Sequence, residues 1–102
     1  MAVISITKDN FASTVLASEK PVLLDFYAAW CGPCRMVSPL VDEIAEEHPE
    51  YVVGKIDVDV EGELAQQFGI VSIPTLIAMK GGQIVRQTVG YAPKDDILSM
   101  ME

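Results

Sequence analysis

Two cysteines separated by two residues are the side chains of this sequence best suited to chemistry. Cys31 and Cys34 are the only cysteines among 102 residues, and the segment AAWCGPCRMV (residues 28–37) also holds the only tryptophan, Trp30. Thiols at this spacing can form a reversible disulfide, whereas closing so short a loop would stabilise the fold little. We therefore interpret the pair as a chemical feature rather than a structural one.

The residues around the two cysteines predict how the thiols would react. Cys31 lies where a helix pattern begins, and free N–H groups and the positive end of the helix dipole favour a thiolate there. Gly32 is expected to permit a tight turn, and Pro33 to preset the backbone of the first helical turn. Cys31 would attack a target disulfide, which requires an exposed sulfur of low pKa. Cys34 would then attack the mixed disulfide, which requires proximity and a base.

Other uses of a Cys-x-x-Cys pattern fit this sequence less well. A structural zinc site needs four ligands, and the chain adds only one histidine, His48, and carboxylates to the two cysteines. Covalent haem attachment needs a histidine directly after the second cysteine, where Arg35 stands. Two inert buried thiols are the remaining alternative, which leaves their position after an apolar run unexplained. We expect no bound metal.

An apolar run and a helix pattern flank the cysteines and must position them. The run VLLDFYA (residues 22–28) is typical of a central strand that is covered on both faces. The helix pattern follows the cysteines and ends at His48 and Pro49. Its apolar stripe comprises Met36, Val37, Leu40, Val41, Ile44 and Ala45.

The rest of the chain continues this alternation of strand and helix patterns. A short edge strand at residues 3–6 precedes a helix with Phe11, Val15 and Leu16, capped by Thr7, Asp9 or Asn10. The later patterns are a strand at 52–60, a short helix at 62–69, a hairpin at 75–89 around Gly81-Gly82, and a helix after Pro93. Helical connections should make the central strands parallel, and the hairpin adds antiparallel pairing. We predict one α/β domain, residues 1–102, with a mixed sheet.

The acidic composition limits the classes of partner. The formal net charge is −8 at pH 7, with a pI near 4.4. Such a surface repels the phosphates of nucleic acids and of anionic membranes, so neither is an expected partner. The most apolar stretch, residues 21–30, has about half the length of a membrane span. Because no basic and apolar leader opens the sequence, we expect a cytoplasmic protein.

Four motifs give the sequence a resemblance to the thioredoxin family over nearly its whole length. They are DFYAAWCGPCRM (25–36), KIDVD (55–59), VSIPTL (71–76) and the pair GG…VG (81–90). The resemblance implies the thioredoxin fold, a three-layer α/β/α sandwich around a central mixed β-sheet of four or five strands. It also implies a protein-disulfide reductase and dithiol electron carrier, acting through a redox-active Cys31–Cys34 disulfide.

The resemblance assigns catalytic roles to three residues and a supporting role to a fourth. Cys31 corresponds to the nucleophile and Cys34 to the resolving thiol. Asp25 corresponds to an aspartate that assists proton transfer at the resolving cysteine, and burial in its apolar run should raise its pKa. Lys55 corresponds to a lysine beside that aspartate, whose charge would oppose this rise. A solvated strand carboxylate and an exposed strand lysine are the alternatives.

Four further residues resemble the family's target-binding groove. Ile73-Pro74 corresponds to a cis-proline turn opposite the cysteines, which would let the Ile73 backbone pair with an extended target segment. Trp30 corresponds to an exposed aromatic wall, and Gly90 lies across the groove. The alternatives are a trans proline at an edge strand, a core tryptophan and an ordinary turn glycine.

The resemblance also implies partners. Electrons would come from NADPH through a separate thioredoxin reductase, because the chain has no Gly-rich dinucleotide motif and should bind no cofactor. Targets would be oxidised proteins of the ribonucleotide reductase or peroxiredoxin type. The protein itself would act as a monomer. One alternative is an oxidase or isomerase, although those relatives usually carry histidine where Gly32-Pro33 stand. Another is a redox-independent binding subunit that uses the groove around Trp30, Pro74 and Gly90.

Overall fold

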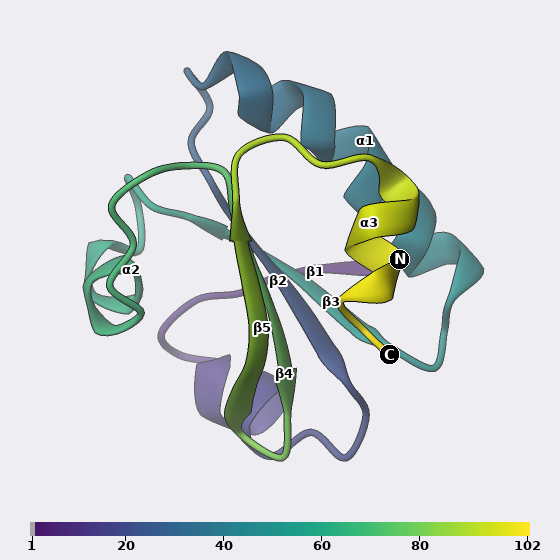
Figure 1. Cartoon of the computed structure of the whole chain (residues 1–102). Coiled ribbons are helices and arrows are strands. Elements are labelled where there is room, and N and C mark those ends of the chain that lie inside the picture. Colours follow the sequence, from purple (N-terminus) through teal and green to yellow (C-terminus); the bar gives the residue numbers. More distant parts are fainter. Residues whose placement is uncertain (1) are drawn as a thin grey trace.

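A five-stranded mixed β-sheet lies at the centre of the computed structural model, which describes residues 2–102 (Figure 1). The strand order is β1-β3-β2-β4-β5, so the apolar run of β2 occupies the middle and β1 an edge, as predicted. The strands are β1 (Val3–Ser5), β2 (Val22–Tyr27), β3 (Val52–Asp57), β4 (Thr75–Lys80) and β5 (Gln83–Val89).

Strand direction confirms one part of the prediction and corrects another. β1, β3 and β2 pair in parallel, and β4 and β5 form the predicted hairpin around Gly81 and Gly82, whose φ angles are 57° and 77°. The expectation that every helical connection keeps the central strands parallel is wrong for β4, which pairs antiparallel with β2. The connecting helix α2 (Gly62–Gln67) is about 9 Å long, too short to return the chain along a strand of about 20 Å.

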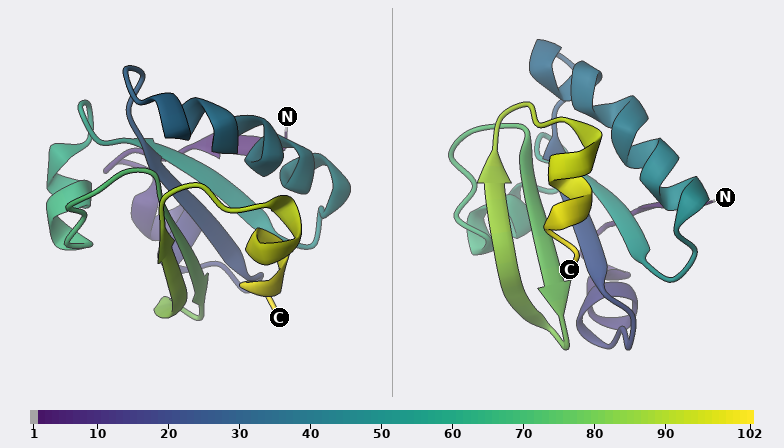
Figure 2. Two further views of the ribbon diagram at one scale, coloured as in Figure 1. Left: turned by 45° about the horizontal axis from the view of Figure 1, so that its top comes forward. Right: turned by 45° about the vertical axis from the view of Figure 1, so that its right-hand side comes forward.

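Helices cover both faces of the sheet (Figure 2). α1 (Gly32–Glu47) and α3 (Lys94–Ser99) pack on one face, and α2 and the single π-helical turn η1 (Ala12–Leu16) pack on the other. Side chains of β2 alternate between the layers, so Leu23 joins the core beneath α1 while Phe26 joins the core beneath η1 and α2. The predicted three-layer arrangement, with a mixed sheet of five strands between two helical layers, is therefore confirmed for residues 2–102. Among residues 2–102, no helix has the length and apolar character needed to cross a membrane.

The first predicted helix is the least accurate part of the sequence analysis. Residues 12–16 form one π-helical turn, and no side chain of the described segment caps it. The carboxamide oxygen of Asn10 instead accepts the backbone N–H of Thr7, and Leu16 is 45% exposed. Asn10, one of the three residues expected to cap the helix, thus stabilises the preceding turn instead.

Helix α1 buries the predicted stripe with one exception. Val37, Val41 and Ile44 are fully buried against the sheet, whereas Met36 is 61% exposed. The assignment of Met36 to the core was therefore wrong.

Candidate active site

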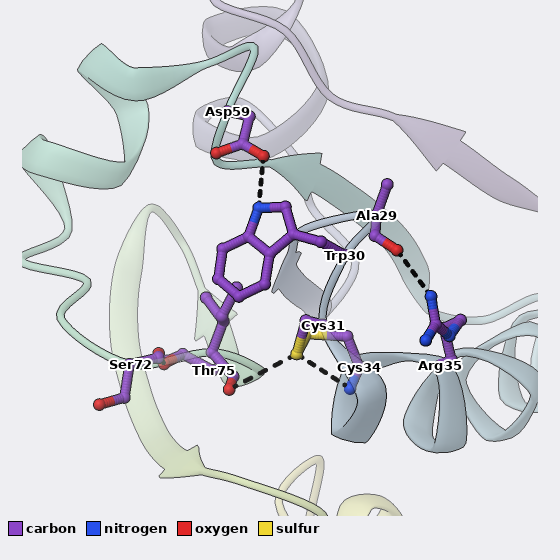
Figure 3. The surroundings of a disulfide bond; sticks show 9 residues. Ala29, Trp30, Cys31, Cys34, Arg35, Asp59, Ser72 and Thr75 are labelled. Carbon is purple, nitrogen blue, oxygen red and sulfur yellow. Dashed lines mark hydrogen bonds between the residues drawn. A yellow bond between two sulfur atoms is a disulfide. The ribbon is translucent and has the colours of Figure 1, made fainter.

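A disulfide joins Cys31 and Cys34 where the chain passes from β2 into α1 (Figure 3). The two Cα atoms are 5.2 Å apart, a separation that a disulfide spans without displacement of the backbone. Cys31 is the extended N-cap residue of α1, and Cys34 lies in the first helical turn. The structure thus brings the two thiols within bonding reach.

The first turn of α1 aims a donor at one of the two sulfurs. The backbone N–H of Cys34 donates to Sγ of Cys31 over 3.2 Å, so the sulfur occupies the position of a conventional N-cap oxygen. Pro33 lies in the same turn and has no N–H to leave unsatisfied. In the reduced protein the same donor and the helix N-terminus would stabilise a thiolate on Cys31.

A hollow of about 520 Å³ reaches Cys31. The sequence analysis expected an exposed sulfur, but Cys31 is only 5% exposed. A target can reach its sulfur through this hollow. Cys34 is 2% exposed and is absent from the described residues that line the hollow. The lining consists of residues 30–33 and 70–73, with Val58 and Ala65.

The structure does not support the role expected for Gly32. Its φ is not among the positive values found at Gly69, Gly81, Gly82 and Gly90. A Cβ at position 32 would meet no atom of the described chain within 4 Å. Because Gly32 is the first residue of α1 with ordinary helical geometry, the turn does not require a glycine.

Trp30 forms one wall of the hollow and is 67% exposed. Its indole Nε1 donates to Oδ2 of Asp59 over 2.8 Å, which fixes the ring beside the sulfurs (Figure 3). The N–H of Asp59 in turn donates to Oδ1 of Asp57 over 2.9 Å. The sequence analysis missed Asp59, and its place just after β3 in the motif KIDVD was the available signal.

The segment before β4 lies opposite the cysteines. The Ile73–Pro74 peptide bond is cis, and the carbonyl oxygen of Ile73 lies 3.8 Å from Sγ of Cys31. Pro74 is buried, and its carbonyl accepts the N–H of Gly90 over 2.8 Å. Trp30, Cys31 and Ile73 therefore share the hollow, whereas Pro74 and Gly90 meet each other beside it.

The sequence analysis also missed the loop that forms the far wall of the hollow. Ile70, Val71 and Ser72 line it, and Val71 is 95% exposed. Two β-branched apolar residues directly after the turn at Gly69 were the available signal.

Asp25 is a buried acidic residue on the central strand β2. It is 1% exposed, and neither carboxylate oxygen has a hydrogen-bond partner within residues 2–102. Burial raises its pKa to about 7, the charge of Lys55 opposes that rise and the charge of Asp42 adds to it. Alternation along β2 places Asp25 on the α1 face, next to Tyr27, which packs against the two cysteines. The predicted burial and raised pKa of Asp25 agree with the structure.

Lys55 lies beside Asp25 but bonds elsewhere. The two residues are register partners on β2 and β3, yet the Lys55 ammonium donates to Oδ1 of Asp42 over 2.7 Å and to Oγ of Ser38. Cys34, Ser38 and Asp42 follow one another at intervals of four residues, which places them on one face of α1. The sequence analysis missed Ser38 and Asp42, and this spacing was the signal.

Comparisons with known proteins identify what the chain is similar to. A family model described as Thioredoxin matches residues 2–102. The chain is 50% identical over 97 residues to a thioredoxin of Alicyclobacillus acidocaldarius, covering 94% of this chain and 91% of that protein. It is 49% identical over 96 residues to a bifunctional thioredoxin reductase/thioredoxin of Mycobacterium leprae, covering 93% of this chain and 21% of that protein. A solved structure, a mutant thioredoxin from Halobacterium salinarum, superposes with TM-score 0.89 at 33% identity, covering 97% of this chain and 87% of that one.

Proposed function

Because the chain belongs to the thioredoxin family, and is thus a dithiol redox carrier and protein-disulfide oxidoreductase, we propose that Cys31 attacks the target and Cys34 resolves the intermediate. One observation carries this assignment: the hollow reaches Cys31, whereas Cys34 is absent from its lining. The backbone N–H that points at the Cys31 sulfur supports the same assignment, because it favours the thiolate that attacks.

Two exchange steps pass two electrons to the target. The Cys31 thiolate attacks one sulfur of the target disulfide, the target bond breaks, and its second sulfur leaves as a thiolate that takes up a proton. Cys34 then loses its proton and attacks Sγ of Cys31. The bond between Cys31 and the target breaks, the target leaves fully reduced, and the Cys31–Cys34 disulfide remains.

Asp25 is the group we assign to accept the proton of Cys34. It faces the α1 side of the sheet, makes no hydrogen bond within the described chain, and has a pKa of about 7. A base that is partly ionised near neutral pH suits proton transfer at that pH. The charge of Lys55 on the neighbouring strand limits the rise of this pKa.

The hollow is the surface we assign to target binding. An extended target segment would lie between the indole of Trp30 and the backbone of Ile73, with its disulfide over Cys31. Pro74 and Gly90 would continue this surface, since Gly90 is bonded to the Pro74 carbonyl.

A separate thioredoxin reductase is the electron donor we propose, with NADPH used only through that enzyme. The relative from Mycobacterium leprae supports this pairing, because its name joins both proteins in one chain. The cytoplasm is the proposed compartment, and oxidised proteins of the ribonucleotide reductase or peroxiredoxin type are the proposed targets. No observation favours the redox-independent binding subunit as the main role.

An insulin-reduction assay with NADPH and a bacterial thioredoxin reductase tests the function. The protein should support continuous NADPH oxidation, and Cys31→Ser should abolish it. Cys34→Ser should trap a mixed disulfide between Cys31 and the target, visible by mass spectrometry. Trapping through Cys34 in the Cys31→Ser variant instead would overturn the assignment of the two thiols.

A further inference from the structure

The ammonium group of Lys55 is bound by helix α1 rather than by the nearest buried carboxylate. It donates to Asp42 over 2.7 Å and to Ser38, and the Lys55 side chain is 15% exposed. Asp25 is its register partner on the adjacent strand, yet both Asp25 oxygens lack a hydrogen-bond partner among the described residues. A buried carboxylate and a nearby cation would normally pair, so this arrangement needs a cause.

The topology brings Lys55 close enough to Asp25 for such a pair to form. Strands β2 and β3 are adjacent and parallel, and register partners in a parallel pair project to the same side of the sheet. Helix α1 covers that side. Ser38 and Asp42 lie one and two turns after Cys34 on this helix, so the resolving thiol and both Lys55 partners belong to one element.

We propose that Asp42 and Ser38 are positioning residues that hold the Lys55 ammonium group on α1 and thereby leave the Asp25 carboxylate without an ion pair. The inference rests on the proton-acceptor role proposed above for Asp25. Within residues 2–102 neither residue is hydrogen-bonded to the reacting sulfurs, and the proposed action of both on Asp25 passes through Lys55.

The consequence concerns the strength of Asp25 as a base. An ion pair favours the charged carboxylate, so it would lower the pKa of Asp25 and weaken its affinity for a proton. The charged groups that act on Asp25 are Lys55 from β3 and Asp42 from α1. The neighbouring titratable group on its own strand is Tyr27, whose pKa is raised by burial, by Asp57 and by Asp25, so it stays neutral. Burial is the largest influence on the Asp25 pKa, and the position of Lys55 is the means by which the fold limits the opposing effect of a positive charge.

Carboxyl titrations by carbon-detected NMR of the oxidised protein test the proposal. The set comprises the parent protein, Asp42→Asn, Lys55→Met and the double variant. Asp42→Asn should lower the titration midpoint of Asp25 by about one pH unit, because the released ammonium can approach Asp25. Lys55→Met should raise the midpoint. In the Lys55→Met background, Asp42→Asn should shift the midpoint by less than half as much, as expected for residues that act through each other.

Two outcomes of this cycle would overturn the proposal. An equal shift in both backgrounds would mean that Asp42 acts on Asp25 by its own charge alone. No shift in either background would mean that Asp42 has no influence. Glu43→Gln is the matched control, because it also removes an ion-paired carboxylate from α1, but one bound to Lys94. It should leave the Asp25 midpoint in place, and a fall equal to that of Asp42→Asn would also contradict the proposal.

Ser38→Ala separates position from charge. The substitution removes one hydrogen bond to Lys55 and alters no formal charge. A lower Asp25 midpoint in this variant can therefore arise only from movement of the ammonium group, and we expect a shift in the direction of Asp42→Asn but smaller. An unchanged midpoint would overturn the role of Ser38.

A kinetic measurement distinguishes this inference from the proposed function. Mixing the reduced protein with excess bis(nitrobenzoate) disulfide should release the coloured thiolate in two phases, of which the concentration-independent phase is the attack by Cys34. Asp42→Asn should shift the acid limb of this phase to lower pH, together with the carboxyl midpoint. If Asp25→Asn leaves the phase unchanged at every pH, the proton-acceptor role of Asp25 fails. The NMR cycle would still decide whether Asp42 and Ser38 hold Lys55.

Discussion

The two sulfurs of one disulfide lie in contrasting halves of the same site. Cys31 borders an open hollow whose wall is an indole that is 67% exposed. Cys34 is 2% exposed and lies on the side of the sheet where Asp25 is buried with no hydrogen-bond partner in the described part of the chain. An attacking thiolate needs access and donors, whereas a resolving thiol needs shielding and a base. One turn of helix separates these two requirements.

The two halves are also built from different kinds of structure. The surface half uses loops: Trp30 and Asp59 follow β2 and β3, and Ile73 precedes β4. The interior half uses regular elements, with Asp25 and Lys55 on paired strands and Ser38 on α1. Loops tolerate substitution better than paired strands do. Because the surface half forms the hollow, we expect substitutions there to alter target affinity. Because the interior half holds the buried base, we expect substitutions there to alter pH dependence.

The largest effect on reactivity should appear when only one of the two thiols is present. In Cys34→Ser, the thiol of Cys31 should react with iodoacetamide at neutral pH about a hundredfold faster than the thiol of Cys34 does in Cys31→Ser. The reason is that Cys31 combines access through the hollow with a backbone donor to its sulfur. Alkylation followed by mass spectrometry gives both rates. Equal alkylation rates for the two thiols would mean that Cys31 and Cys34 do not differ in access or in thiolate stabilisation.

The largest effect on stability should come from Asp25. Its pKa is about 7 in the folded protein and about 3.8 when exposed, so the folded state binds more protons between these values. Stability should therefore fall as pH rises from 4 to 8, by up to about 4 kcal/mol from this group. Urea unfolding at pH 4 and pH 8 measures this change. In Asp25→Ala, the free energy of unfolding should fall much less between the two pH values than in the parent protein. A loss of the same size in the variant would mean that Asp25 is solvated in the folded protein.

Changes at the surface half should be smaller and of a different kind. Trp30→Ala should lower kcat/KM for insulin reduction about fivefold, mainly through KM, because one wall of the hollow is lost. Asp59→Ala should lower it about twofold, since the indole loses its hydrogen bond. The pH-dependent loss of stability should stay at the parent value in both variants. A change in it would show that the two halves are coupled.

The smallest effect should come from Gly32→Ala. The position has ordinary helical geometry and space for a methyl group, so stability should rise by about 0.5–1 kcal/mol. The alkylation rate of Cys31 should stay within about twofold of the parent value, because the donor to its sulfur comes from Cys34. Thermal unfolding and the alkylation assay measure both. A large loss of reactivity would restore the structural role that the sequence suggested for this glycine.

Local features explain most of the successful predictions. The apolar run of β2, the Gly81-Gly82 hairpin and the position of Cys31 at the start of α1 each depend on neighbouring residues. The failed predictions concern side chains whose actual surroundings the residue pattern did not indicate. Met36 has the right helical spacing but is 61% exposed, and the side chain of Asn10 accepts the backbone N–H of Thr7 instead of capping a helix.

By itself, the sequence determined the chemistry of the protein: a dithiol at a helix start, an acidic residue within a buried strand, and the order of the elements. Only the tertiary structure decided that Asp59 holds the indole of Trp30 and that Ser38 and Asp42 hold Lys55. The partners in these contacts lie 13 to 29 residues apart in the chain, so no local pattern reports them. The spacing of residues records which face of an element a side chain occupies. The packing of elements against one another decides which side chains of neighbouring elements meet, and hence which charges act on the buried Asp25.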